Sequence, residues 1–302
     1  MKISILFIGA LNDGGFNQSA LHGAQRLHAS GDHPIKIISD IPYDQAAMSA
    51  ALSAAAKESD GIVFVGGQGN LVTPPVAAAF PDRSFAIVQG NMQTDNIASY
   101  DVLQEQSAFL AGVLAARMTQ SGIVGHLSGH RIVPGLKGRA AFVSGVRYVD
   151  SGLPILTGFC GTQDDNDTTE TWTRDLAAAG ADVIFTMLNA ARSGATKACR
   201  ETAIRQIGNV SDWCAQDPDV FVASALARID KGIVRAVSDM RAGILPDTIR
   251  HLGLAEDVVG LSVAPDVTPA VRDEIAVTRD LIAAGKLAIE TTYDGPEFEA
   301  TT

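Results

Sequence analysis

Short apolar runs alternate with helix-like segments along almost the whole of this 302-residue chain. The runs are rich in β-branched residues and include "ISILFIGA", "DGIVFVGG", "SFAIVQG", "ADVIFTML" and "VFVASA". Between them lie Ala-rich or amphipathic stretches such as "DQAAMSAALSAAAKES" and "SGATKACRETAIRQ". This alternation predicts an α/β protein in which helices cover both faces of mostly parallel sheets.

A parallel sheet of this length usually divides, and the rhythm breaks near Asp101 to Glu105. Two late helices, "DKGIVRAVSDMRAG" and "VRDEIAVTRDLIAAGKL", are expected to pack back on the two halves. We therefore expect an N-terminal lobe from residues 1–104 plus about 227–250. A C-terminal lobe would take residues 105–226 plus about 251–302, with a ligand cleft between the lobes.

Composition excludes several classes of protein. The net charge of −11 argues against a nucleic-acid partner, which needs basic patches. No run of 18 apolar residues predicts a membrane span. Cys160, Cys199 and Cys214 are too scattered for a disulfide framework or a zinc site. No signal peptide or lipidation site is visible, which leaves open a processed chain or a cytoplasmic one.

The loop "LNDGGFNQSALHG" follows the first expected strand, where open α/β sheets bind ligands. Its two glycines let backbone amides approach a ligand closely. Phe16 can stack on a flat heterocycle, and Asp13 or Asn17 can recognise its polar edge.

The same loop has a purely structural interpretation. Asn17 is well placed as a helix N-cap, and Phe16 and Leu21 then have the spacing of a hydrophobic staple. The residues of the loop alone leave both interpretations open.

Neutral hydrogen-bonding side chains follow two further strands of the first lobe. Gln68 and Asn70 stand in "FVGGQGN", and Gln89 and Asn91 in "IVQGN". The full G-x-G-x-x-G spacing and a Walker lysine are both missing, so phosphate binding is not expected. These residues are candidate ligand contacts, or they belong to ordinary strand-to-helix turns.

The second lobe offers a similar set. Asn189 follows the strand in "FTMLNAARSG", before a helix expected to start near Ser193. Ser211, Asp212 and Trp213 lie in a loop after a short strand in "IGNVSDWCAQD". Trp213 either stacks on an aromatic ligand or caps the core.

Signatures of catalysis are missing from the sequence. It has neither a G-x-S-x-G elbow nor an H-E-x-x-H helix. His126 and His130 are expected to be ordinary surface or loop histidines, because Gly129 argues against a shared helix. Asp164 and Asp165 are expected in a solvated loop and helix cap. We therefore predict a binding protein without enzymatic activity, cofactor or metal.

Six stretches occur in the order found in the basic membrane protein (Bmp) family, the ABC-transporter substrate-binding proteins that capture purine nucleosides: "DGGFNQSA", "EQSAFLAGVLAA", "SGIVGHLSG", "AAFVSGVRYV", "GADVIF" and "LIAAGKLAI". The chain resembles this family from about Lys2 to Glu290. The resemblance implies the type I periplasmic-binding-protein fold, with two Rossmann-like lobes, three crossovers and a ligand clamped in the cleft. It also implies that Asp13, Phe16 and Asn17 contact the base.

The sequence departs from the nucleoside binders of that family at two positions. Val210 stands where they carry a ribose-binding aspartate, and Ala227 where they carry a lysine. "GNVSDW" resembles instead the "GQASDM" loop of a branch that binds a free nucleobase, and Asn189 matches an aspartate in the "HTDSPA" loop of that branch. The resemblance therefore favours a purine-like nucleobase, or a similar planar nitrogenous heterocycle, over a nucleoside.

We thus expect a solute-binding protein that is monomeric, lies in the periplasm or is tethered outside the cytoplasm, and delivers its ligand to an ABC permease. With Asp13, Glu105 and Asp212 near the cleft, the ligand is expected to be neutral or cationic. The alternatives are a nucleoside-binding protein of the same transporter class, a cytoplasmic ligand sensor, and an enzyme acting on nucleosides or bases.

Overall fold

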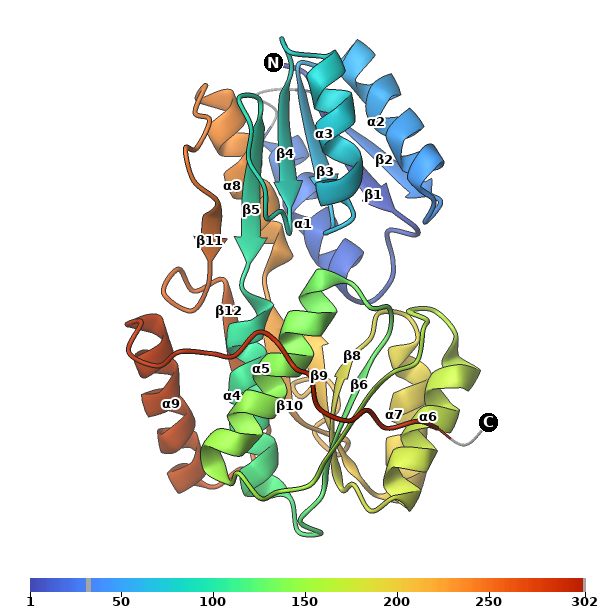
Figure 1. The fold of residues 1–302 in the computed structure, drawn as a ribbon, viewed down its shortest axis with the longest axis vertical. Coiled ribbons are helices and arrows are strands. Elements are labelled where there is room, and N and C mark those ends of the chain that lie inside the picture. Colours follow the sequence, from blue (N-terminus) through green and yellow to red (C-terminus); the bar gives the residue numbers. More distant parts are fainter. Residues whose placement is uncertain (31–33, 301–302) are drawn as a thin grey trace. The chain divides into compact units, whose positions relative to one another are not determined.

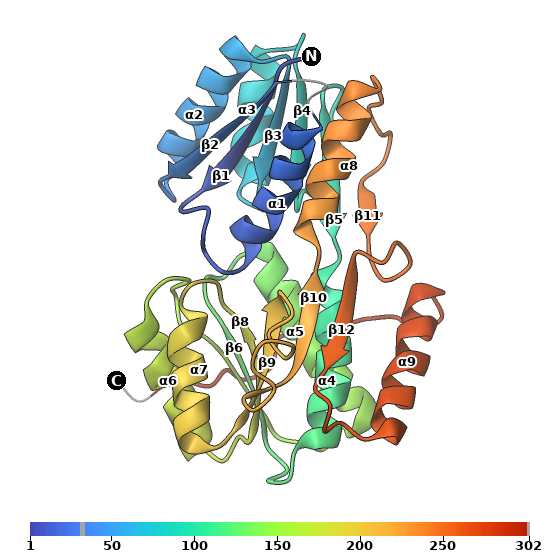
Figure 2. The ribbon, with the colours of Figure 1, turned by 180° about the vertical axis from the view of Figure 1, so that it is seen from behind.

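The computed structural model describes residues 1–30 and 34–300, which form two compact units (Figures 1 and 2). Unit 1 consists of Met1–Val102 and Arg228–Leu252. Unit 2 consists of Leu103–Ala227 and the chain from Gly253 onward. The polypeptide therefore passes from one unit to the other three times.

Unit 1 is built on a six-stranded parallel sheet with the order β11-β5-β4-β3-β1-β2. Its strands are β1 (Ile3–Ile8), β2 (Ile35–Ile41), β3 (Gly61–Val65), β4 (Ser84–Val88), β5 (Ile97–Val102) and β11 (Arg250–Leu252). Its helices are α1 (Phe16–Ala29), α2 (Gln45–Glu58), α3 (Gly69–Ala79) and α8 (Ile229–Arg241). Helices α2 and α3 cover one face (Figure 1), and α1 and α8 lie side by side on the other (Figure 2).

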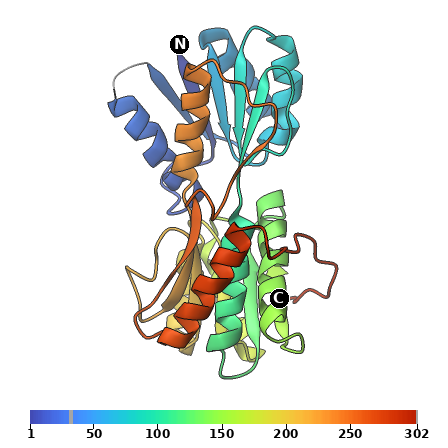
Figure 3. The ribbon, with the colours of Figure 1, turned by 90° about the vertical axis from the view of Figure 1, so that its left-hand side faces the viewer.

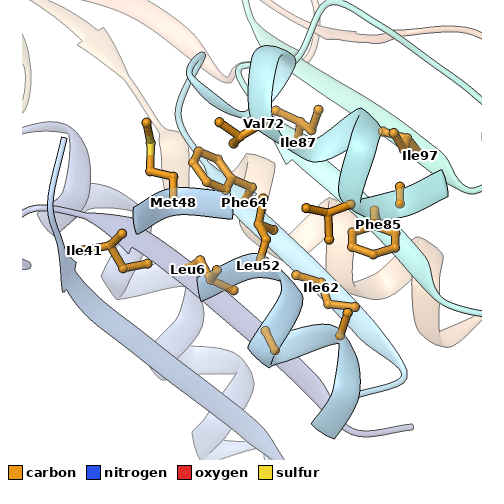
Figure 4. Packing of buried hydrophobic residues seen from close by; sticks show 14 residues of the cluster. Leu6, Ile41, Met48, Leu52, Ile62, Phe64, Val72, Phe85, Ile87 and Ile97 are labelled. Carbon is orange, nitrogen blue, oxygen red and sulfur yellow. The ribbon is translucent and has the colours of Figure 1, made fainter. Parts of the chain in front are cut away.

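The core of unit 1 explains why its strands read as unbroken apolar runs. Leu6, Phe64 and Ile87, from three neighbouring strands, pack against Leu52 of α2 and Val72 of α3 (Figure 4). Strands that are covered by helices on both faces need apolar side chains at nearly every position. All five residues of β3 are accordingly buried.

Unit 2 repeats the design with the order β12-β10-β9-β8-β6-β7, in which only β12 is antiparallel. Its strands are β6 (Val124–Ser128), β7 (Ile155–Phe159), β8 (Val183–Met187), β9 (Arg205–Val210), β10 (Phe221–Ala227) and β12 (Val259–Val263). Its helices are α4 (Gln104–Met118), α5 (Val133–Val149), α6 (Asn166–Ala178), α7 (Arg192–Thr202) and α9 (Pro269–Ala283).

Two glycines bring α4 and α5 together on one face of this sheet. A Cβ atom on Gly112 would lie 2.1 Å from the carbonyl oxygen of Phe142, and one on Gly145 would lie 2.1 Å from that of Phe109. The two helix backbones are therefore in direct contact. Helix α9 packs beside α4 at the outside of unit 2 (Figure 3).

These two sheets confirm the predicted α/β class. The two late helices pack as expected, α8 against α1 in unit 1 and α9 against α4 in unit 2. Within the described residues, no helix is long and apolar enough to cross a membrane.

One expectation about the histidines is wrong. His126 lies in the middle of β6 and is fully buried, not in a loop or at the surface. Its Nδ1 is 2.8 Å from the Thr157 hydroxyl and its Nε2 is 2.9 Å from that of Ser128. Burial lowers the pKa of His126 to about 3, so the ring is a neutral part of the core.

Candidate ligand-binding residues

Six of the predicted residues of unit 1 lie at the carboxyl ends of its strands. The carboxyl ends of parallel strands share an edge, and β1, β3 and β4 are neighbours in this sheet. Asp13 lies in the loop after β1, and Phe16 and Asn17 lie in the first turn of α1 that follows it. The loops after β3 and β4 carry Gln68, Gln89 and Asn91.

Asp13 organises the first of these loops. Its Oδ1 accepts hydrogen bonds from the backbone N–H groups of Gly15 (2.8 Å) and Gln18 (3.0 Å), and its Oδ2 accepts one from Asn17 (3.0 Å). The side chain is buried at the start of α1, where a carboxylate is stabilised by the helix dipole. Asp13 therefore holds the loop in shape whatever else it contacts.

The structure corrects the N-cap and the hydrophobic staple that the sequence suggested for this loop. The N-cap of α1 is Gly15, not Asn17, so Phe16 is the first helical residue. The staple positions then fall on Gly14 and Ser19, and the spacing of Phe16 to Leu21 has no such role. Asn17 instead donates both hydrogens of its Nδ2 to the carbonyl oxygens of Ile8 (2.7 Å) and Ala10 (2.9 Å), which fixes the end of β1.

Hydrogen bonds also join the loops after β3 and β4. The Asn70 side chain donates to the carbonyl oxygen of Gly67 (2.9 Å) and accepts from the backbone N–H of Asn91 (2.9 Å). The Gln68 side chain folds back over Gly66, where a Cβ atom would lie 2.4 Å from its Oε1. Asn70 thus links the turn that contains Gln68 to the turn that contains Asn91.

Gln89 has an uncommon backbone conformation at the end of β4. Its φ is 71°, in the left-handed region that costs a non-glycine residue about 1–3 kcal/mol. Its Oε1 accepts the backbone N–H of Val102 at 2.7 Å. Strain of this kind persists where the surroundings fix the backbone and often accompanies binding sites.

Unit 2 gathers a second set at the carboxyl edge of its own sheet. Asn189 follows β8, and its backbone N–H donates to the Oε1 of Gln163 at 3.0 Å. Gln163 follows β7, and its carbonyl oxygen accepts the N–H of Ala191 at 2.8 Å. Gln163, which the sequence did not single out, therefore positions the loop of Asn189.

The loop after β9 carries Ser211, Asp212 and Trp213, and it is tied down by its own polar groups. The Asp212 Oδ1 accepts the hydroxyl of Ser262 at 2.7 Å. The backbone N–H of Trp213 donates to the hydroxyl of Ser224 at 2.9 Å. Ser211 closes the turn through its N–H, which donates to the carbonyl oxygen of Asn209 at 2.8 Å.

Trp213 is packed into the edge of the core. The indole Nε1 donates to the carbonyl oxygen of Asn209 at 3.0 Å, and the ring lies against Gly208 and Phe221. The guanidinium carbon of Arg192, at the start of α7, lies 3.2 Å from the ring centroid. Trp213 thus already makes a cation–π contact. A ligand that stacks on the same face of the indole has to displace Arg192.

Two cations change the charge balance expected from the sequence. Lys137 of α5 forms an ion pair of 2.5 Å with Glu105 in the first turn of α4. Arg192 is buried and donates from its NH1 to the carbonyl oxygen of Asn189 at 3.3 Å. The expectation of a neutral or cationic ligand rested on Asp13, Glu105 and Asp212 and on the absence of a lysine at position 227. It stays a prediction, and in unit 2 these two cations offset part of the negative charge on which it relied.

The two positions that depart from the nucleoside binders lie next to each other. Val210 ends β9 and is paired with Leu226 of β10, the residue before Ala227. Both Val210 and Ala227 are buried, at 5% and 2% exposed. Val210 has a φ of 66°, which is rare for a β-branched residue. Both positions therefore hold buried apolar residues at the ends of neighbouring strands.

Across residues 1–30 and 34–300, no group of three or more His, Cys, Asp or Glu side chains is arranged to hold a metal ion. The candidate residues are amides, hydroxyls, aromatic rings and carboxylates, most of them engaged with backbone groups. Such an arrangement suits recognition by hydrogen bonding and stacking.

Comparisons with known proteins point to one family. The family model "ABC transporter substrate-binding protein PnrA-like" (Bmp) matches residues 1–290. Basic membrane protein B of Borrelia garinii is 26% identical over 284 residues, covering 87% of this chain and 81% of that protein.

Two solved structures share the fold, which is that of type I periplasmic binding proteins. A solute-binding protein of an ABC transporter system from Aeropyrum pernix has a TM-score of 0.84 at 23% identity, covering 97% of this chain and 94% of that one. A transcriptional activator of the comK gene from Bacillus halodurans has a TM-score of 0.78 at 18% identity, covering 93% and 97%. The family match extends over nearly the whole chain, and the chain therefore belongs to the Bmp family of PnrA-like ABC-transporter substrate-binding proteins.

Proposed function

We propose that this protein captures a purine-like nucleobase, or a similar planar nitrogen-rich heterocycle, for an ABC importer. The observation that carries the choice of ligand is that both positions, at the ends of neighbouring strands, hold buried apolar residues, Val210 and Ala227. In the nucleoside binders that this chain resembles, an aspartate and a lysine at these positions hold the sugar.

Apolar residues at these two positions make the binding of a sugar unfavourable. A ribose placed against Val210 and Ala227 would lose water from its hydroxyl groups without gaining partners. An unsatisfied buried hydroxyl costs roughly 1–3 kcal/mol. A free base has no such groups and avoids the cost.

Each unit contributes side chains to the ligand in this proposal. Phe16 of unit 1 provides a stacking surface, and Asp13, Asn17, Gln68, Gln89 and Asn91 provide polar contacts. Glu105, Asn189, Ser211, Asp212 and Trp213 contribute from unit 2.

The protein acts outside the cytoplasm as a monomer that docks on a permease and performs no chemistry. The name of the Borrelia garinii relative, a basic membrane protein, supports a place at the membrane. A ligand sensor is the second candidate, since the Bacillus halodurans transcriptional activator shares the fold.

The test is a thermal-shift screen of free purine and pyrimidine bases, nucleosides and small nitrogenous metabolites, followed by calorimetry. A ligand present at 100 times its Kd stabilises the folded state by about 2.7 kcal/mol, which is easily measured. A purine base is expected among the strongest stabilisers. Stabilisation by metabolites of other chemistry and by no purine would contradict the proposed ligand.

A second assay separates an importer component from a sensor once the ligand is known. A binding protein in its liganded form should stimulate ATP hydrolysis by its cognate permease in liposomes. A sensor would leave that rate unchanged.

A further inference from the structure

Residues 291–300 run as an extended segment across unit 2, beyond the end of the family match at residue 290 (Figures 1 and 3). Figure 1 shows the segment passing over α5, and a hydrogen bond joins it to β7, the edge strand of the sheet. There the backbone N–H of Phe298 donates to the carbonyl oxygen of Thr157 at 2.8 Å. The segment thus adds a main-chain contact to a strand edge.

An acidic side chain anchors the segment between two arginines. Glu297 pairs with Arg131, before α5, and with Arg139, within α5. The Arg139 side chain is only 6% exposed, so its charge is held where water reaches it poorly. The Arg131 guanidinium, with a further contribution from Arg139, lowers the pKa of Glu297.

Aromatic contacts flank this anchor on both sides. The Phe298 ring meets Trp172 of α6 edge-on, with centroids 6.2 Å apart. Gly158 makes room for them, because a Cβ atom there would lie 2.4 Å from Trp172 and 3.0 Å from the Phe298 carbonyl oxygen. On the other side, the Arg139 guanidinium lies 4.8 Å from the centroid of the Tyr293 ring.

The segment and the face beneath it carry opposite charge. Residues 290–300 contain Glu290, Asp294, Glu297 and Glu299 and no basic residue. The face beneath presents Arg131, Arg139 and Arg147, and Arg147 also approaches the Tyr293 ring, at 5.8 Å. A basic face is unusual in a chain with a net charge of −11.

We propose that the face of unit 2 formed by β7, α5 and α6 is a docking site for an extended acidic and aromatic peptide, and that residues 291–300 occupy it as a detachable strap. Recognition combines backbone pairing with an edge strand, a glutamate held by two arginines, and one aromatic residue on each side. The docked strap covers an edge that would otherwise be open to pairing with other chains. The proposal does not depend on which ligand the protein carries.

The direct test supplies the strap as a separate molecule. A chain that ends at Glu290 is titrated with a synthetic peptide of residues 291–300, and the full-length chain is titrated in parallel. We expect the shortened chain to bind one peptide, and the full-length chain to bind at least tenfold more weakly because its site is filled. Absence of binding to the shortened chain, or equal binding to both, would overturn the proposal.

Peptide variants test the anchor. Glu297→Gln in the peptide should weaken binding to the shortened chain at least tenfold, and added salt should weaken the unmodified peptide in the same direction. Glu299→Gln removes the same charge from an exposed neighbour and should leave binding within twofold. Equal losses from the two changes would show nonspecific attraction and would contradict the docking site.

A second measurement covers the case in which the shortened chain does not fold. In the full-length protein, amide hydrogen exchange of Phe298 reports the bond to Thr157. We expect Glu297→Gln to speed this exchange at least tenfold and Glu299→Gln to leave it unchanged. Equal exchange in both variants would contradict the anchor.

Discussion

The guanidinium carbon of Arg192 lies 3.2 Å from the centroid of the Trp213 ring, so the first residue of α7 covers the aromatic side chain in the loop after β9. The indole also packs on Gly208 and Phe221. A ligand that stacks on Trp213 from the side of Arg192 must displace the guanidinium. The proposed stacking role of Trp213 therefore includes a competition between Arg192 and the ligand.

Replacing Arg192 tests this competition. Arg192→Met keeps an apolar contact with the indole and removes the cation–π contact, which is worth about 1 kcal/mol. We expect the affinity for a purine base to rise about fivefold. Emission from Trp213 measures the titration when Trp172, the other of the two tryptophans, is changed to Phe. Weaker binding by Arg192→Met would show that Arg192 contacts the ligand itself.

Phe16 is the proposed stacking surface of unit 1. Phe16→Ala should weaken binding of a purine base by about 1–3 kcal/mol, the usual contribution of an aromatic side chain stacked on a base. Phe80→Ala is the matched control, because Phe80 packs against the core of the same unit but follows the far end of α3. The control should lower the melting temperature and leave affinity unchanged. The same loss of affinity in both variants would contradict stacking on Phe16.

The buried His126 makes stability fall in weakly acidic solution. The unfolded chain protonates this residue near pH 6.5, whereas burial lowers the pKa in the folded state to about 3. The stabilising contribution is complete above pH 6.5 and is lost as the pH falls towards 3. At pH 5 the loss is about 2 kcal/mol, from 1.36 kcal/mol for each pH unit.

Urea denaturation at pH 7.5 and pH 5 measures this effect in the native chain and in His126→Gln. The variant keeps a donor and an acceptor for Thr157 and Ser128 but cannot become charged. Between pH 7.5 and pH 5, the free energy of unfolding of the variant should fall by about 2 kcal/mol less than that of the native chain. An identical pH dependence in both proteins would assign the acid sensitivity to other groups.

Polar side chains can be introduced at positions 210 and 227 to test their role in the choice of ligand. Aspartate tolerates the left-handed backbone at position 210 better than valine, so Val210→Asp suits the observed φ of 66°. Together with Ala227→Lys it offers an acceptor and a donor to a sugar. We expect this double variant to narrow or reverse the preference for a base over its nucleoside. A ratio of Kd values equal to that of the native chain would show that these positions do not face the sugar.

Much of the fold was predictable because a parallel sheet covered on both faces needs continuous apolar strands. Such runs mark β1, β3, β4 and β8 in the sequence. The edge strands β11 and β12 carry no such mark. The three residues of β11 are all partly exposed, and β12 is partly exposed along most of its length.

The sequence predicts where the candidate residues lie relative to the strands, but it does not predict which side chains they contact. The loops that follow strands could be read from the sequence, and they carry Asp13, Phe16 and Asn189. The side chains that hold those loops come from other elements, as Gln163 holds Asn189 and Lys137 pairs with Glu105. The N-cap was assigned wrongly because Asp13 fixes the start of α1 from outside the helix, so that Gly15 takes the place expected for Asn17.

The most direct test of the proposed function compares one base with its own nucleoside, for example guanine with guanosine, by calorimetric titration of the native chain. We predict that the base binds at least tenfold more tightly, because burying even one sugar hydroxyl without a partner costs roughly 1–3 kcal/mol and 1.4 kcal/mol is a factor of ten. Tighter binding of the nucleoside would contradict the proposed ligand and would show that side chains other than those at positions 210 and 227 bind the sugar.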